Sequence, residues 1–322
     1  MASSRTVTVA GATGFVGRSL TRQLLERGHA VRAFVRDRAK ADAVLASHER
    51  LEITVGDCLE ERDCHAAVEG SDSCIHLVGI LREQGSVTYE RAHVVATRNM
   101  ASACESVGAI RFIHMSSMGV SPLSEAAYLR TKFDSERVIR NSSLDWTILR
   151  PGLIHGPDGE FTQLAANWAR GTSPPHFFMP YFTRIEIDDT GRHTVIPQVQ
   201  PVFVDDIAKA TADALDCDQA IGEIIPLAGA QTLDFADMLR TIRDALPDLG
   251  PRLAAIGIPG HLAAMKAQML EFVGAGALLP FNTSMAIMAQ QDCTADLTKA
   301  HATLNFNPAG FTESLHRYAN NL

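Results

Sequence analysis

The 322-residue sequence predicts an α/β fold: a doubly wound parallel sheet with a smaller, mainly helical lobe beside it. Two observations carry this prediction. Short apolar and β-branched runs alternate with helix-patterned stretches along the first half of the chain, which is the order that builds βαβ units. The first of these units also has closely spaced glycines at its turn, as phosphate-binding βα turns do.

The composition excludes several classes of protein. Hydrophobic residues make up 46% of the chain and charged residues 20%, which argues against disorder and fits a soluble globular protein. The net charge of −8, without a basic stripe, predicts no nucleic-acid partner. No uncharged apolar run reaches ~18 residues, so we expect no transmembrane segment.

The six cysteines are scattered, without a C-x-x-C pair or a zinc-like set. We therefore expect reduced thiols, no metal and a cytoplasmic location. The chain enters its first predicted strand within a few residues of the N-terminus, so we expect no signal peptide.

The first strand, Thr6 to Val9, leads through a glycine turn into a helix over Phe15 to Arg27. Gly11 allows a sharp turn, Gly14 lets the backbone approach a pyrophosphate, and Gly17 lets the helix lie against the strand. Helix N–H groups then face the anion. The alternative is a structural turn that holds no ligand. The residues expected at the phosphates are Gly11, Thr13, Gly14, Phe15, Val16 and Gly17.

A second buried strand, Ala30 to Val35, ends at the position that reads the cofactor's ribose. An acidic residue there favours NAD, whereas an arginine favours the 2′-phosphate of NADP. Arg36 is the first residue after the apolar run and Asp37 the second. NADP(H) is therefore the preferred cofactor and NAD(H) the other option, and a solvated charge cluster is the alternative reading.

Further strands are predicted at Leu51 to Val55, which Asp57 follows, and at Ser73 to Val78. Asp57 also suits the N-cap of a following helix over Leu59 to Val68. The segment Leu77, Val78 and Gly79 would pass the middle of the cofactor, with Gly79 allowing close approach.

The fifth strand, Ile110 to Met115, follows a helix over Tyr89 to Val107 and delivers Ser116 and Ser117 at its carboxyl end. Open α/β sheets bind their ligands at this end. The next helix carries Tyr128 and Lys132, which lie four apart on one face and can meet the same ligand. The alternative is an exposed helix face with an amphipathic tyrosine and a solvated lysine.

The rest of the chain has a weaker strand–helix rhythm. A proline-broken apolar loop, Pro174 to Pro180, is expected to line a pocket. For the apolar stretch Leu262 to Phe281, core packing or a pocket is favoured over membrane contact. Other predicted elements are strands at Ser143 to Leu149, Pro201 to Val204 and Glu223 to Leu227, and a helix at Phe161 to Ala169. Residues 1–157 and 198–230 are assigned to the sheet domain, and 158–197 and 231–322 to the smaller lobe.

Four motifs together resemble the atypical and extended short-chain dehydrogenase/reductases, which have a Rossmann-type sheet. They are Gly11-Ala-Thr-Gly-Phe-Val-Gly17, His114-Met-Ser-Ser117, Tyr128-Leu-Arg-Thr-Lys132 and Thr147-Ile-Leu-Arg-Pro-Gly-Leu-Ile-His-Gly156. Nearest is the branch similar to the NDUFA-nine-like accessory subunit of respiratory complex I. His93 and Ala96 depart from the family's Asn-Val-x-Gly-Thr-x-Asn segment.

The resemblance implies hydride exchange between a nicotinamide and a carbonyl or alcohol carbon. Tyr128 would exchange the proton, Lys132 would lower its pKa and bond the nicotinamide ribose, and Ser117, with Ser116 in reserve, would hold the substrate oxygen. Asp57 would lie beside the adenine, and Pro151 and Leu153 in the loop beneath the nicotinamide. His155 stands where the family often has tyrosine, and packing is favoured over catalysis for it.

Three functions are compatible with these residues. The first is an NAD(P)(H)-dependent oxidoreductase, the second a non-catalytic NADPH-binding protein of structural, assembly or sensing use, and the third a sugar-nucleotide epimerase or dehydratase. The partner is a small-molecule substrate, and the apolar small lobe favours a hydrophobic carbonyl, lipid or quinone. Peripheral membrane or complex association is compatible with the same resemblance.

Overall fold

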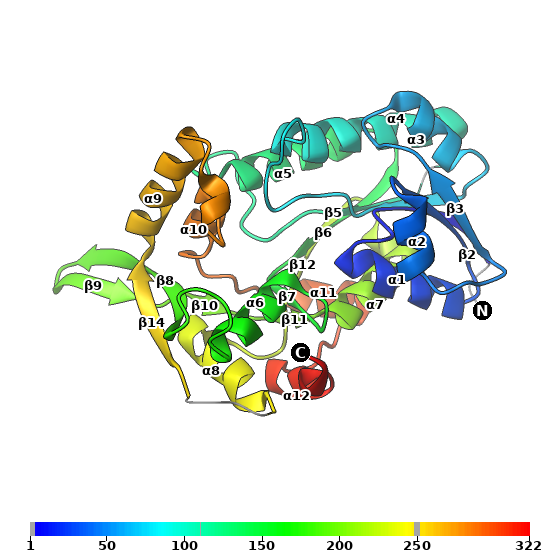
Figure 1. The fold of residues 1–322 in the computed structure, drawn as a ribbon. Coiled ribbons are helices and arrows are strands. Elements are labelled where there is room, and N and C mark those ends of the chain that lie inside the picture. Colours follow the sequence, from blue (N-terminus) through cyan, green and yellow to red (C-terminus); the bar gives the residue numbers. More distant parts are fainter. Residues whose placement is uncertain (1–3, 110, 248–251) are drawn as a thin grey trace.

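The computed structural model describes residues 4–109, 111–247 and 252–322, and it contains a seven-stranded parallel sheet (Figure 1). The strand order is β12-β6-β5-β4-β1-β2-β3, so the chain reverses its direction of winding between β1 and β4. The predicted α/β, doubly wound fold is confirmed. The strands are β1 (Thr6–Ala10), β2 (Ala30–Val35), β3 (Leu51–Val55), β4 (Ser73–His76), β5 (Arg111–Met115), β6 (Asp145–Pro151) and β12 (Glu223–Leu227).

Helices cover both faces of this sheet, which explains why its strands are apolar on both sides. In Figure 1, α3, α4 and α5 lie on one face, and α1 and α7 on the other. These helices are α1 (Phe15–Glu26), α2 (Arg38–Val44), α3 (Glu61–Val68), α4 (Ala96–Val107), α5 (Ala127–Arg140) and α7 (Val204–Leu215). The predicted helix over Tyr89 to Val107 begins as a π-helix, η1 (Glu90–Val95), which continues into α4.

The smaller lobe contains more strand than the sequence predicts. β14 (Ala254–Pro259) pairs with β8 (Phe178–Asp188), which also pairs with β9 (Gly191–Val195). The expected loop at Pro174 to Pro180 therefore ends inside a strand. Alternate β8 residues Met179, Tyr181 and Thr183 are buried, a period of two that the prolines conceal in the sequence.

The remaining elements lie in the smaller lobe or beside the main sheet (Figure 1). α11 contributes Ala300 and Leu304 to the core of the main sheet. These elements are α6 (Glu160–Ala169), α8 (Phe235–Ala245), α9 (Gly260–Phe272), α10 (Thr283–Met288), α11 (Thr298–Leu304), α12 (Phe311–His316), β7 (Ile154–His155), β10 (Gln198–Val199), β11 (Val202–Phe203), β13 (Leu233–Asp234) and the short helices η2 (Asp218–Ala220), η3 (Gly276–Leu278) and η4 (Ala319–Asn321).

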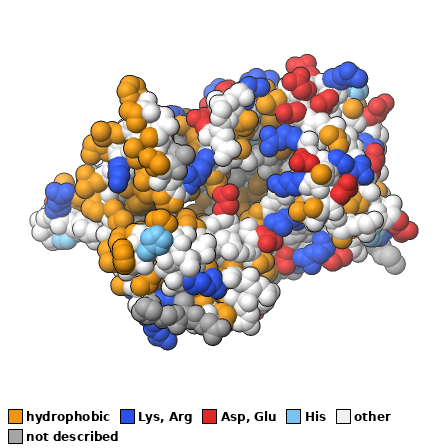
Figure 2. All heavy atoms as spheres, in the orientation of Figure 1, with side chains coloured by type: hydrophobic (Ala, Val, Ile, Leu, Met, Phe, Trp, Pro, Cys, Tyr) orange, Lys and Arg blue, Asp and Glu red, His pale blue; other side chains and the backbone are white. Residues whose placement is uncertain are grey.

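The apolar stretch around α9 is exposed and does not pack in a core, contrary to expectation. Leu262, Met265, Met269 and Phe272 are 49%, 52%, 67% and 91% exposed, and their spacing places them on one face of α9. Figure 2 shows this hydrophobic surface at the upper left. The buried side of α9 is made by small residues, so its large apolar side chains are left for the solvent side. We name Leu262, Met265, Met269 and Phe272 the α9 face.

Candidate functional site

The glycine turn lies at the point where the winding of the sheet reverses. Gly11 follows β1 with a φ of 89°, a conformation that favours glycine. A Cβ on Gly17 would lie 2.2 Å from the Gly11 carbonyl oxygen, so α1 approaches the strand as only a glycine allows. Both expected geometric roles are confirmed, and open α/β sheets bind ligands in the crevice at such a reversal.

The start of α1 has the free donors that a phosphate needs. Gly14 is the exposed N-cap of α1 and makes no side-chain cap. The first N–H groups of a helix have no partners within the helix, and the dipole is positive there. The Phe15 ring packs closely against two glycines. A Cβ on Gly156 would lie 3.0 Å from this ring, and a Cβ on Gly159 would lie 3.2 Å from it. The residues present therefore fit a diphosphate, and Thr13 and Val16 flank this turn.

Arg36 and Asp37, the two residues after β2, have different surroundings. Asp37 caps α2 by accepting a hydrogen bond from the Lys40 N–H at 3.0 Å. Arg36 is exposed and remains the candidate reader of a 2′-phosphate. Asp57 does not cap α3, whose N-cap is Glu60; its carboxylate accepts from the Leu59 N–H at 2.9 Å and closes a turn. Its place beside an adenine stays a prediction.

The turn after β4 runs directly alongside the glycine turn. The Leu77 N–H donates to the Ala10 carbonyl at 2.9 Å, and a Cβ on Gly11 would lie 3.4 Å from the Val78 nitrogen. Gly79 is exposed, and a Cβ there would lie 3.1 Å from Lys132 Nζ. The close approach found at Gly79 is toward Lys132, and its approach to a cofactor stays a prediction.

The two serines after β5 differ in their partners. Ser116 is buried and donates to Glu136 Oε1 at 2.6 Å. Glu136 also accepts from Arg150 through both of its oxygens, at 2.8 Å and 2.6 Å. Ser117 is half-buried and donates to the Met118 carbonyl at 3.2 Å. Since Ser116 is held by the Glu136–Arg150 pair, Ser117 is the serine left to meet a substrate oxygen.

Tyr128 lies on α5 near Ser117. Loss of solvent raises the pKa of Tyr128 to about 12, and hydrogen bonding from Ser117 opposes this rise. Lys132 does not contribute to the shift, so the expected lowering of the Tyr128 pKa by Lys132 is not found. The Lys132 Nζ donates instead to the Met115 carbonyl at 3.0 Å. At neutral pH the phenol is therefore protonated.

Lys132 is buried, with 4% of its surface exposed. Burial lowers the pKa of Lys132 to about 8, and the nearby Glu136 carboxylate opposes this lowering. Among the described residues its ammonium donates one hydrogen bond, to the Met115 carbonyl, and an ammonium has three donors. An amine that can be charged or neutral near pH 8 suits a group that passes protons.

Three histidines that the sequence analysis did not select lie near Lys132. His93 contacts the edge of the Tyr128 ring, at a centroid distance of 5.2 Å. His76 and His114 stack at 5.7 Å, and neither ring nitrogen of His76 has a hydrogen-bond partner among the described residues. Burial and the charge of Lys132 lower the pKa of His76 to about 3. The Asn-to-His departure at His93 was the one sequence signal that marked this group.

The loop after β6 is held from several sides. The Met118 N–H donates to the Pro151 carbonyl at 2.9 Å, and the Val202 N–H to the Leu153 carbonyl at 2.9 Å. His155 is buried and pairs with the Tyr318 hydroxyl at 2.8 Å, in agreement with a packing role. Burial lowers the pKa of His155 to about 3.

The structure describes residues 4–109, 111–247 and 252–322. Within them no helix combines the length and the apolarity needed to span a membrane. Within them, too, no three His, Cys, Asp or Glu residues are grouped so that they could hold a metal.

The glycine turn at the winding reversal and the polar groups beside it define a dinucleotide-binding α/β protein. A family model described as NAD(P)H-binding matches residues 11–171, half of the chain. The chain belongs to this NAD(P)H-binding family.

Individual relatives agree with this assignment. Over 229 residues the chain is 30% identical to NADH dehydrogenase (ubiquinone) 1 alpha subcomplex subunit 9, mitochondrial, of Rattus norvegicus, covering 69% of this chain and 56% of the rat protein. It is 38% identical over 122 residues to a 3 beta-hydroxysteroid dehydrogenase/Delta 5-->4-isomerase of Mycobacterium tuberculosis, covering 35% of this chain and 32% of that protein. The chain thus spans about half the length of the rat relative, or less for the second.

A solved structure shows the same fold. UDP-glucuronic acid 4-epimerase from Bacillus cereus, in complex with NAD, superimposes with a TM-score of 0.68 at 20% identity. The superposition covers 98% of this chain and 97% of the epimerase. The chain is therefore an NAD(P)-binding Rossmann protein similar to epimerases and short-chain dehydrogenase/reductases.

Proposed function

We propose that the protein is an NADP(H)-dependent reductase of a hydrophobic carbonyl. The observation that supports this most is the half-buried, protonated phenol of Tyr128, which lies near Ser117 and one helix turn before Lys132 on α5. A phenol with a pKa of about 12 is a proton donor at neutral pH. Such a group serves carbonyl reduction better than alcohol oxidation, which needs a base.

Each residue of the site has its own role in the proposed reaction. NADP(H), when bound at the glycine turn, supplies the hydride to the carbonyl carbon. Ser117 hydrogen-bonds the carbonyl oxygen and holds it near Tyr128, which gives its proton to that oxygen as the alcohol forms. Lys132 stabilises the phenolate left on Tyr128 and returns a proton to it, because its own pKa lies near 8. Arg36 selects the 2′-phosphate.

A hydrophobic substrate is supported by the surroundings of Tyr128. Tyr128 packs against a small apolar cluster of Val120, Ala126 and Leu129, and Ile287 and Met288 of α10 pack against the same cluster. The mycobacterial relative is named for a hydroxysteroid, which is a lipid. We keep the cytoplasm as the proposed location, supported by six cysteines that are all free thiols.

The test is the fate of bound cofactor. Purified protein loaded with NADPH is exposed to a panel of hydrophobic aldehydes, ketones and quinones, and absorbance of NADPH is followed. We expect at least one substrate to oxidise it, and Tyr128→Phe to slow this by about a hundredfold or more while NADPH affinity stays within twofold. NADPH that no compound oxidises, together with an inert Tyr128→Phe change, would refute the reductase.

A second function is favoured by the α9 face. A non-catalytic NADPH-binding subunit of a larger assembly would need an apolar contact surface, and the rat relative is named as a subunit of NADH dehydrogenase. For this function, Met269→Ser with Phe272→Ser should leave NADPH affinity unchanged and shift the native chain from a large to a small species in gradient sedimentation of gently lysed cells. No shift would count against it.

A further inference from the structure

We infer that His93 is a positioning residue, whose neutral imidazole ties the cofactor-side turn after β4 to the helix that carries Tyr128 and Lys132. The inference rests on the proposed function for the roles of those two residues. His93 is 1% exposed and belongs to the π-helix η1, a wide turn that recurs at functional sites.

The two ring nitrogens of His93 reach two different elements. Nδ1 lies 2.8 Å from Thr131 Oγ1, on α5 directly before Lys132. Nε2 lies 3.2 Å from the Ile80 nitrogen, in the turn that follows Gly79. A Cβ on Gly79 would lie 3.7 Å from the same Nε2, so the imidazole fills the space between turn and helix.

The hydrogen bonds select one tautomer. With the proton on Nδ1, His93 donates to Thr131, accepts from the Ile80 N–H, and leaves the Thr131 hydroxyl to donate to the Tyr128 carbonyl at 3.0 Å. With the proton on Nε2, the ring would donate to the Ile80 carbonyl at 3.3 Å and the Ile80 N–H would lose this acceptor. Three bonds are better than two at a buried site.

The imidazole must also stay neutral. Lys132 is the charged group that faces it, and burial followed by this charge lowers the pKa of His93 to about 2. A neutral ring can stack on Tyr89, at a centroid distance of 5.5 Å, and make its T-shaped contact with Tyr128. Because it carries no charge, it does not repel the Lys132 ammonium. His93 therefore holds the distance between the turn at Gly79 and the Tyr128–Lys132 face of α5.

The consequence concerns one half of the cofactor. In the proposed site Lys132 bonds the nicotinamide ribose and Gly79 passes the middle of the cofactor, whereas the glycine turn and Arg36 hold the phosphates and adenosine. Loss of His93 should therefore weaken binding of a whole dinucleotide but not of a fragment that lacks the nicotinamide. Adenosine 2′,5′-bisphosphate is such a fragment.

The experiment compares calorimetric affinities for NADPH and for adenosine 2′,5′-bisphosphate. His93→Ala is expected to weaken NADPH about tenfold and the fragment less than twofold. His93→Asn, which keeps a donor near the Nδ1 position, should recover part of the loss. His155→Ala is the matched control, since His155 is also buried, neutral and bonded to a hydroxyl. It should lower Tm and leave the ratio of the two affinities unchanged.

Nitrogen-15 spectra of the histidines in the native chain give a second measurement that needs no variant to fold, apart from His93→Gln for assignment. We expect His93 to carry its proton on Nδ1 from pH 5 to pH 9. An unchanged affinity ratio in His93→Ala, or an Nε2–H tautomer, would overturn this inference alone. A wild-type chain that binds neither NADPH nor the fragment would overturn it together with the proposed function.

Discussion

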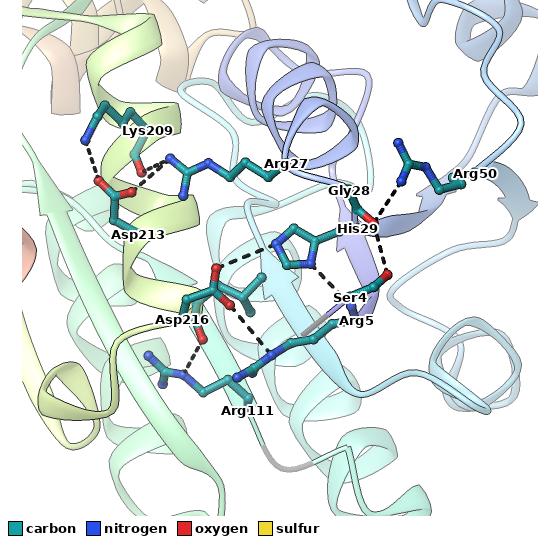
Figure 3. Close-up of polar contacts among 11 residues, drawn as sticks. Ser4, Arg5, Arg27, Gly28, His29, Arg50, Arg111, Lys209, Asp213 and Asp216 are labelled. Carbon is teal, nitrogen blue, oxygen red and sulfur yellow. Dashed lines mark hydrogen bonds and ion pairs between the residues drawn. The ribbon is translucent and has the colours of Figure 1, made fainter. Parts of the chain in front are cut away.

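The two ends of the central sheet bury polar groups in opposite ways. At the amino end, the buried Arg111 donates to four uncharged acceptors. Asp216 lies 3.7 Å from Arg5 and 3.6 Å from His29 (Figure 3), although its Oδ1 accepts no hydrogen bond from the described residues. At the carboxyl end, His76 has no hydrogen-bond partner among the described residues, and Lys132 has a single carbonyl.

This difference separates stability from chemistry. A buried charge with a full set of acceptors helps to hold the fold, because removing it leaves several polar groups unsatisfied. The buried amine of Lys132 has unused donors and lies beside neutral imidazoles, so it lowers stability. Such a group indicates a role in binding a ligand or in chemistry on it. Loss of Arg111 should therefore lower the stability of the fold more than it affects ligand binding, and loss of Lys132 should affect function more than stability.

The largest effect expected is on turnover, in Lys132→Met. Loss of the amine should slow NADPH oxidation by about a hundredfold or more, since the Tyr128 phenolate is no longer stabilised. The folded pKa of Lys132, about 8, lies below its ordinary value of 10.5. At pH 7 the charged amine therefore destabilises the folded state, and the protein gains stability as pH rises from 8 to 10.5. Without it, urea unfolding should show a gain of about 1–2 kcal/mol. A large loss of stability would break the comparison.

Arg111→Met should lower the stability of the fold and leave cofactor binding unchanged. Its guanidinium bonds the carbonyls of Asp145, Ala214 and Leu215 and the Thr147 hydroxyl. Leaving these acceptors without a donor should lower the free energy of unfolding by about 2–4 kcal/mol. The NADPH affinity of the folded protein, measured by calorimetry below its melting temperature, should stay within twofold. Weaker NADPH binding would show that the two ends are coupled.

Acid should act on the carboxyl end through His76. Its folded pKa of about 3 lies below the unfolded value of about 6.5, so only the unfolded state takes up this proton between those values. Its contribution is complete above pH 6.5 and is lost as pH falls. Urea unfolding should show that the free energy of unfolding of the wild type falls between about pH 6.5 and pH 5. In His76→Phe this fall should be smaller by about 2 kcal/mol.

His29 provides the control at the amino end. Burial also lowers the pKa of His29, but the Asp216 carboxylate opposes this lowering. His29→Phe should therefore change the acid sensitivity less than His76→Phe does. Equal effects would show that burial alone governs both histidines.

The smallest effect expected is cofactor selection by Arg36. This residue is exposed, so solvent and salt screen its contact with a 2′-phosphate. Arg36→Ala should weaken NADPH about tenfold and NADH less than twofold. Equal losses for both, measured in the same titrations, would contradict the role given to Arg36.

Much of the sheet could be predicted because its signals are local. The strands Ala30–Val35, Leu51–Val55 and Glu223–Leu227 have the bounds expected from their apolar runs. The turn at Gly11 and the helix contact at Gly17 follow from glycine's missing Cβ, a property of single residues. Tyr128 and Lys132 share a helix, so their common face also follows from spacing alone.

What could not be predicted depends on long-range contacts. The tie of Ser116 to Glu136 and Arg150 joins three elements, and it decides which serine is free. The rise in the Tyr128 pKa depends on how far the packing of α5 removes this side chain from solvent. The exposure of Met269 in the α9 face depends on which side of α9 the rest of the lobe covers, and a helix that is apolar all round gives no signal of that choice.

The central claim is that a nicotinamide dinucleotide binds at the carboxyl end of the sheet with its ring beside Tyr128. The most direct test is a titration of the wild-type chain with NADPH, followed by nicotinamide fluorescence. Saturation at one NADPH per chain, with the emission shifted to shorter wavelength as the ring leaves water, is the predicted result. A titration without saturable uptake, or saturation with the emission of free NADPH, would contradict the account.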